Sequence, residues 1–256
     1  MKSKTLSITL LFALSALLFI AGYRCSGTKK ATENEPVEII NTNINGTGLK
    51  IEVDFLKGDS HNHPLMAIWI EDKEGHYIET LYIAESIGKG IFRHGVKSQG
   101  EWEAGPVRRP AALPFWGHQR GIAADDGLYI PTPENPMPDA VTGPTPSGNF
   151  TLQSKSTAPT PSVFKLLLEI NQPWDWNEYW TNSKFPDDVN YATSSQPAVI
   201  YEVMIDMNSA ATEFQMVPIG HSHYSGLDGS LSPDLSTLST ALEIVKSAKV
   251  KITSKN

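Results

Sequence analysis

Cysteine is almost absent from this 256-residue chain, which holds a single one at Cys25. A lone cysteine excludes a disulfide within the chain, so the fold must be stabilised by a hydrophobic core. Basic residues are also scarce, because 21 Lys and Arg face 28 Asp and Glu and give a formal net charge of −7. This acidic balance disfavours nucleic acid and anionic lipid as partners, since both repel a negatively charged surface.

Recognisable signatures of catalysis are missing as well. The sequence shows no P-loop, no Ser-His-Asp set that can be argued and no paired carboxylates suited to general acid–base chemistry. An enzymatic activity therefore has no residues to which it can be assigned, and a non-catalytic role is favoured.

The main apolar run lies near the N-terminus. Lys2 and Lys4 precede residues 5–21, which are almost wholly apolar, and Cys25 follows them. This pattern is typical of a secretory signal or an N-terminal anchor. Cys25 stands where a bacterial lipoprotein carries its lipidated cysteine, although Tyr23 and Arg24 are larger than the residues that the lipoprotein signal peptidase prefers. Plain cleavage, lipidation and an uncleaved anchor remain open.

The N-terminal pattern predicts the organisation of the whole chain. We expect residues 1–25 to be a signal peptide or membrane anchor and residues 26–36, which are polar, to be a flexible tether. Residues 37–256 then form a single extracytoplasmic domain at the cell envelope, either in the periplasm or held at the membrane by the N-terminus.

Alternating hydrophobicity predicts β-structure in this domain. Leu49, Ile51, Val53 and Phe55 alternate with charged residues, as in a strand with one buried face. Further strands are predicted at residues 37–44, 65–71, 77–83, 149–155, 163–170, 198–206 and 213–219. Residues 65–71 are apolar on both faces, which indicates a central strand covered on both sides. Asp234 is expected to cap a short helix before a last strand. Gly- and Pro-rich turns favour an all-β fold, an immunoglobulin-like β-sandwich.

Residues 88–146 differ in composition from the rest of the domain. They contain nine of the 18 prolines, and no regular hydrophobic period extends across them. Aromatic and charged residues accompany the prolines, which favours an ordered segment over a disordered one. We therefore predict a long, ordered Pro-rich insertion with a functional role.

Several stretches together carry a resemblance to a known family. They are residues 63–72, 109–116, 138–148, 169–177 and 221–226. In these stretches the chain resembles a bacterial family described as predicted periplasmic proteins of unknown function. Genes of this family lie beside those of flavin transferases and membrane-bound reductases, so the resemblance implies these two proteins as partners.

The loop at residues 138–148 carries a second resemblance. Asp139, Thr142, Gly143 and Thr145 match the acceptor loop on which bacterial flavin transferases attach FMN through a phosphoester to threonine. The resemblance implies covalent FMN at Thr145, the last threonine. Gly143 would let the loop bend, and Asp139 would steer the loop by hydrogen bonds to its own backbone.

Two features of the loop keep another interpretation open. Pro144 stands where acceptor loops usually carry alanine, and proline fixes φ and removes an N–H group. Asp, Pro, Gly and Ser are also ordinary turn residues, so the loop could be a simple crossover between strands. On the first interpretation, the protein is an accessory of flavin-linked electron transfer that carries FMN or docks a protein that does.

Histidines form a second candidate site. His61 and His63 make one His-x-His pair, His221 and His223 make another, and His118 lies in the Pro-rich segment. Residues i and i+2 of a strand share a face, so each pair could present two imidazoles to one divalent metal ion. Alternatively, these side chains cap backbone groups at turns.

A third candidate is the aromatic segment that contains Trp174, Asp175, Trp176, Asn177 and Trp180. Exposed tryptophans beside Asp and Asn hold sugar rings in carbohydrate-binding sandwiches, through ring stacking and hydrogen bonds to hydroxyls. The same residues could instead close the open end of the sandwich, as buried aromatics do.

Overall fold

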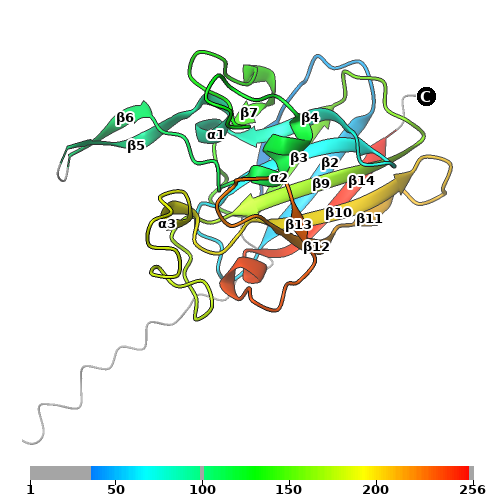
Figure 1. The fold of residues 1–256 in the computed structure, drawn as a ribbon. Helices are drawn as coiled ribbons and strands as arrows, with labels where there is room; N and C mark the ends of the chain where they lie inside the picture. The colour runs from blue at the N-terminus through cyan, green and yellow to red at the C-terminus, as the bar shows by residue number, and fades with distance from the viewer. Residues whose placement is uncertain (1–35, 99–100, 254–256) are drawn as a thin grey trace, which may run out of the picture. The chain divides into compact units, whose positions relative to one another are not determined.

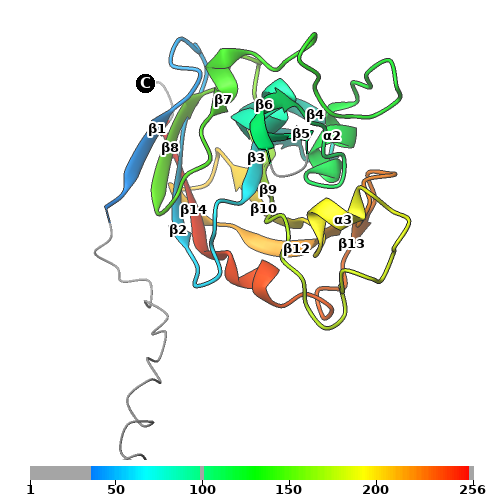
Figure 2. The same ribbon diagram turned by 90° about the vertical axis from the view of Figure 1, so that its left-hand side faces the viewer.

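A computed structural model describes residues 36–98 and 101–253 of the chain, and these residues form two large β-sheets that face each other (Figure 1). The first sheet has the strand order β1 (Glu38–Asn41), β8 (Phe150–Lys155), β2 (Lys50–Lys57), β14 (Val245–Thr253) and β11 (Glu213–Gln215). The second has the order β13 (Leu231–Ser232), β12 (Val217–Ser222), β10 (Val199–Asp206), β9 (Val163–Asn171), β3 (Leu65–Asp72), β4 (Tyr77–Ala84) and β7 (Thr142–Gly143). Seen from the side, β1, β8, β2 and β14 lie on one side of the core, and β3, β9, β10 and β12 lie across from them (Figure 2).

The remaining elements are short. They are α1 (Glu85–Lys89), the hairpin of β5 (Ile91–Ser98) and β6 (Glu101–Pro106), α2 (Pro114–Arg120), η1 (Asp139–Val141), α3 (Tyr191–Ser194) and η2 (Thr240–Glu243). The β5–β6 hairpin projects away from the two sheets in Figure 1.

Period-2 alternation accounts for the core. In β2, the side chains of Ile51, Val53 and Phe55 are buried, whereas the charged residues between them are partly exposed. Strand β3 is buried on both faces, as its sequence predicts. Met66 lies in the core between the sheets, and Trp69 lies in a second cluster that also contains residues of α2. The second sheet is therefore covered on one face by the first sheet and on the other by the Pro-rich segment.

The expected β-sandwich is confirmed, while its assignment to the immunoglobulin type stays a prediction. The hairpin of β5 and β6 in the Pro-rich segment was not predicted, and two predicted elements differ from expectation. The strand predicted at residues 213–219 is split at Met216, because β11 pairs in the first sheet and β12 in the second. The helix expected after Asp234 is only the short η2, because Asp234 Oδ1 instead accepts a hydrogen bond from Ser236 N in a local turn.

Residues 36–98 and 101–253 belong to one compact unit. The predicted leader at residues 1–25 and the tether at residues 26–36, apart from Pro36, lie outside the described residues. Within the described ranges, no helix combines the length and apolar character needed to cross a membrane.

Candidate functional site

The loop expected to accept FMN is attached to the edge of the second sheet. Thr142 and Gly143 form β7, which pairs in parallel with Ile83 and Ala84 of β4. The Tyr82 hydroxyl donates a hydrogen bond of 2.6 Å to the carbonyl oxygen of Pro144. These contacts hold the start of the loop against the sheet.

Gly143 has a different role from the one predicted. Its φ is not positive, and it is buried against Tyr82. A Cβ at Gly143 would lie 2.8 Å from Tyr82 Cε2, which is closer than carbon atoms pack. The glycine is therefore explained by close packing, and freedom to bend is not needed to account for it.

Asp139 and the two threonines of the motif lie in different surroundings. The Asp139 carboxylate pairs with Lys89 Nζ, which also donates to the carbonyl oxygen of Met137 at 3.0 Å. Asp139 therefore fixes the base of the loop through Lys89. Thr142 Oγ1 donates to the carbonyl oxygen of Asp139 at 3.4 Å. The side chain of Thr145 is partly exposed and makes no hydrogen bond to any described residue.

His61 and His63 do not act as a strand pair, because both lie in the connection between β2 and β3. The His61 ring packs edge-on against Phe55 with 5.8 Å between ring centroids, and neither ring nitrogen has a hydrogen-bond partner. Burial lowers the pKa of His61 to about 4, so this ring is neutral at pH 7. His63 is exposed, has a positive φ of 54°, and lies 3.2 Å from Asn62 Oδ1.

The other three histidines are each engaged by neighbouring groups. His221 Nδ1 lies 2.8 Å from the carbonyl oxygen of Ser222, and His223 Nδ1 accepts from Ser225 N at 3.2 Å. His118 Nδ1 lies 2.8 Å from the carbonyl oxygen of Pro114. Across residues 36–98 and 101–253, no group of three or more His, Cys, Asp or Glu side chains is placed to hold a metal ion. The five histidines are therefore not brought together into one set of ligands.

Most of the aromatic segment serves the fold. Trp180 is only 6% exposed, and its ring contacts those of Tyr191 and Tyr224. Asn177 Nδ2 donates to Gln196 Oε1 and to the carbonyl oxygen of Thr237, both at 2.9 Å. These contacts support closure of the sandwich end.

Asp175 and Trp176 also attach the segment to the body of the domain. Asp175 Oδ1 accepts from Thr240 Oγ1 at 2.5 Å, and burial raises the pKa of this carboxyl despite that bond. Trp176 packs against the core and meets the Tyr191 ring edge-on at 5.5 Å between centroids. Neither residue presents its polar or aromatic surface freely to a ligand.

Trp174 is the member of the segment that faces solvent. It is 59% exposed and has a positive φ of 67°, which is unfavourable for a bulky residue. Tyr179 lies nearby in the sequence and is 52% exposed. Lys184 Nζ lies over its ring, 3.1 Å from the ring centroid, in a cation–π contact. These exposed rings are the part of the segment that remains available to a ligand.

An open depression lies beside Tyr179, because Lys184 contacts that ring and also lines the depression. It has a volume of about 510 Å³ and is lined by residues 184–190 with Tyr224 and Leu227. Phe185 stacks on Tyr224 in parallel, with 4.1 Å between ring centroids. The sequence analysis did not identify this lining, because residues 184–190 match no motif and the contribution of Tyr224 and Leu227 depends on the fold.

Glu169 brings the stretches of the resemblance together. Its carboxyl oxygens accept hydrogen bonds from Phe115 N at 3.2 Å and Trp116 N at 2.7 Å. Burial raises the pKa of Glu169 to about 8. The hydroxyl of Ser222 lies beside this carboxyl but makes no hydrogen bond of good geometry. Glu169 thus attaches α2 to the centre of the sheet.

Two further contacts show the same convergence. Ser194 Oγ donates to the carbonyl oxygen of Ala111 at 2.9 Å. Gly226 packs so closely on residue 110 that a Cβ at Gly226 would lie 2.2 Å from the carbonyl oxygen of Pro110. Residues 109–116, 169–177 and 221–226 therefore meet on one face of the second sheet. The sequence feature that could have indicated this site is Glu169, the only charged residue in the otherwise apolar run at residues 166–170.

The chain was also compared with known proteins. Neither the models of protein families, nor the curated proteins, nor the solved structures gave a match to this chain.

Proposed function

We propose that the protein is an extracytoplasmic accessory of flavin-linked electron transfer whose Thr145 accepts FMN from a flavin transferase. The supporting observation is the difference between the two threonines of the loop. Thr142 lies in β7 and donates to the backbone, whereas the Thr145 hydroxyl lies beyond the strand and has no partner among the described residues. Thr145 is thus the threonine of this motif whose hydroxyl is left for a modifying enzyme.

The chemistry requires little of this chain. The Thr145 oxygen attacks the flavin-side phosphorus of FAD and forms a phosphoester, while the diphosphate bond breaks and AMP leaves. The hydroxyl proton passes to a base of the transferase, whose metal ion stabilises the charge on the phosphates. This protein supplies an accessible hydroxyl on a loop whose base is fixed by Tyr82 and Lys89. A membrane reductase would then exchange electrons with the attached flavin.

Periplasmic co-expression with a flavin transferase tests this proposal. Covalent flavin survives denaturation, so the denatured band of the wild type should fluoresce. Fluorescence should vanish in Thr145→Ala and persist in the matched control Thr142→Ala. Pro144→Ala tests whether proline impedes the transferase. A wild-type band without fluorescence, in a host where a known acceptor is labelled, would overturn the proposal.

Carbohydrate binding is a second candidate function, and Trp174 favours it. A left-handed backbone conformation at a bulky residue costs about 1–3 kcal/mol, and such strain gathers at functional positions. Here the strain accompanies an aromatic ring that is exposed to solvent. Tyr179, five residues further along the chain, is also exposed, and Lys184 on its ring lines the open depression. Ring stacking on a sugar would use these surfaces.

The variant Trp174→Gly separates function from fold in this case. Glycine tolerates a positive φ, so the variant should be at least as stable as the wild type. It should nevertheless lose retention in affinity electrophoresis through polysaccharide gels. Tyr129→Phe, a change outside this segment and outside the lining of the depression, serves as the control. Equal retention of Trp174→Gly and the wild type would exclude this role.

A further inference from the structure

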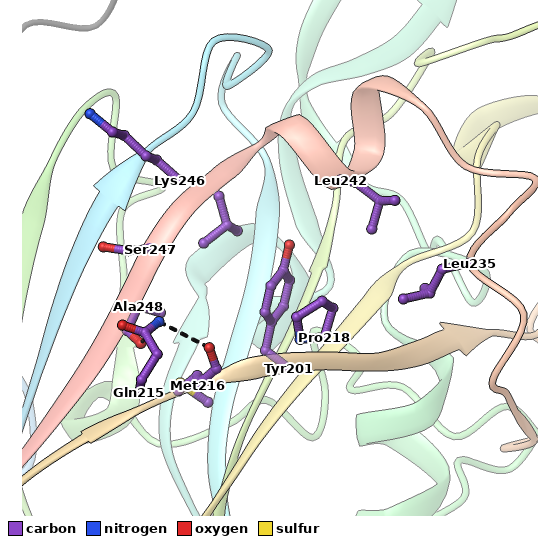
Figure 3. Close-up of a pocket in the computed structure, with 10 residues that line it drawn as sticks. Tyr201, Gln215, Met216, Pro218, Leu235, Leu242, Lys246, Ser247 and Ala248 are labelled. Carbon is purple, nitrogen blue, oxygen red and sulfur yellow. Dashed lines mark hydrogen bonds between the residues drawn. The ribbon is translucent and has the colours of Figure 1, made fainter.

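A cavity of about 250 Å³ opens to the surface where the chain passes from the first sheet into the second (Figure 3). Its lining consists of Tyr201, Gln215, Met216, Pro218, Leu235, Leu242, Val245, Lys246, Ser247 and Ala248. Gln215 Nε2 donates to the carbonyl oxygens of Met216 and Ala248, both at 3.0 Å, and so ties β11 to β14 on one side. The cavity is thus bounded by strands of both sheets.

Two irregularities in the strands border this cavity. In the β10–β12 pair, Ile200 pairs with Gly220 and Tyr201 with Pro218, which leaves Ile219 as an extra residue. In the β14–β2 pair, Val245 pairs with Lys57 and Ser247 with Leu56, which leaves Lys246 as an extra residue. Bulges bend a strand locally and are frequent next to functional sites. Both bulges adjoin residues that line the cavity.

Tyr201 projects from β10 into this space, with its hydroxyl at the tip of the ring (Figure 3). Its side chain is 5% exposed, and the hydroxyl makes no hydrogen bond to any described residue. Burial raises the pKa of Tyr201 to about 12, so the hydroxyl keeps its proton and acts as a donor. Buried polar groups almost always have a hydrogen-bond partner, and none of the described residues accepts a bond from this hydroxyl. The hydroxyl is therefore available to donate to a molecule that occupies the cavity.

The remaining lining limits the chemistry of an occupant. Pro218, Leu235 and Leu242 offer apolar surface around the tyrosine ring. The only charged residue of the lining, Lys246, is exposed and points away from Tyr201 in Figure 3. A charged ligand would therefore be buried without a counter-charge, which disfavours its binding.

We propose that this cavity binds a small uncharged molecule with an apolar body and one hydrogen-bond acceptor, such as an aromatic ketone or ester. Its carbonyl oxygen accepts the Tyr201 hydroxyl, and its body packs against Pro218, Leu235 and Leu242. The volume fits this class, because a cavity of about 150 Å³ already holds benzene and the cavity here is about 250 Å³. This site is independent of Thr145 and of flavin.

Binding can be measured by ligand-observed NMR on the purified full-length protein with three probes. Acetophenone should bind with a dissociation constant on the order of 0.1–1 mM, as expected for a molecule of this size. Ethylbenzene has a similar body but no acceptor, and should bind about tenfold more weakly. Benzoate, which carries a charge, should bind more weakly than acetophenone.

Two variants identify the cavity as the place of binding. Tyr201→Phe removes the donor while keeping the ring, so acetophenone and ethylbenzene should then bind equally. Leu242→Trp fills the cavity and should abolish binding of both, and Tyr179→Phe, which is not part of the lining, should change neither. The proposal is wrong if no probe binds, if acetophenone shows no preference over ethylbenzene in the wild type, or if Leu242→Trp, folded by circular dichroism, binds as the wild type does.

Discussion

Glu169 and Tyr201 lie on neighbouring strands of the second sheet, since Leu168 pairs with Tyr201 and Glu169 with Ile200. They face opposite sides of the sheet. Both oxygens of Glu169 accept backbone hydrogen bonds from α2, whereas the hydroxyl of Tyr201 faces a cavity and has no partner among the described residues. One face thus uses a buried polar group to fix a covering segment, and the other leaves a buried donor free for a ligand.

The largest effect is expected from Glu169→Ala. The substitution leaves two backbone N–H groups of α2 without an acceptor, and should lower the free energy of unfolding by about 3–5 kcal/mol. Urea denaturation followed by fluorescence measures the loss. Glu169→Gln should lose less, because its amide oxygen still accepts one of the bonds. A loss below about 1 kcal/mol in Glu169→Ala would mean that the Glu169 carboxyl contributes hardly more to stability than the Tyr201 hydroxyl, and would contradict the comparison.

The pH dependence of stability tests the same carboxyl. Its pKa rises from an ordinary value of 4.5 to about 8 in the folded state, so only the folded protein holds this proton between those values. Stability must then fall as pH rises through this window, by up to about 1.4 kcal/mol per pH unit. Between pH 6 and 8 we expect a drop of about 2–3 kcal/mol that is missing from Glu169→Gln. Parallel curves for both proteins would contradict the assignment.

Tyr82→Phe sharpens the comparison with a second tyrosine. Tyr82 is buried, as Tyr201 is, but its hydroxyl donates to the carbonyl oxygen of Pro144 at 2.6 Å. Loss of this bond should lower the free energy of unfolding by about 1 kcal/mol. Thermal unfolding would detect it, and an unchanged stability would mean that the bond holds the loop without stabilising the fold.

Tyr201→Phe should have the smallest effect in the absence of ligand. No hydrogen bond within the described residues is lost, so the free energy of unfolding should change by less than about 0.5 kcal/mol. The same denaturation experiment compares it with Tyr82→Phe. A loss as large as that of Tyr82→Phe would show that the Tyr201 hydroxyl already has a strong partner.

The strands could be predicted because their signals are local. Ile51, Val53 and Phe55 alternate in sequence and are buried together, and the apolar run around Trp69 forms a strand covered on both faces. The passage between sheets at Met216 could not be predicted, because Met216 N bonds to Ala248, far along the chain.

The sites were harder to predict for the same physical reason. The expectation that residues i and i+2 share a face holds only within a strand. His61 and His63 both lie in the connection between β2 and β3, and His223 lies beyond the end of β12. Gly143 looked like a flexible turn residue, and only the position of Tyr82 shows that packing requires it. The cavity at Tyr201 is bordered by two bulges, which are shifts in the pairing of neighbouring strands. Such shifts could not be predicted, because the pairing of two strands depends on residues far apart in the sequence.

The edges of the two large sheets bear on how the protein behaves at high concentration. Their outermost strands are β1 with four residues, β11 with three, and β13 and β7 with two each. Long, exposed edge strands are templates on which other chains add strands and aggregate. Each of these four strands offers only a few backbone groups itself, and at β7 the exposed Pro144 follows directly and has no N–H to donate. A strand from another chain could therefore form only a few hydrogen bonds with any one of these four strands.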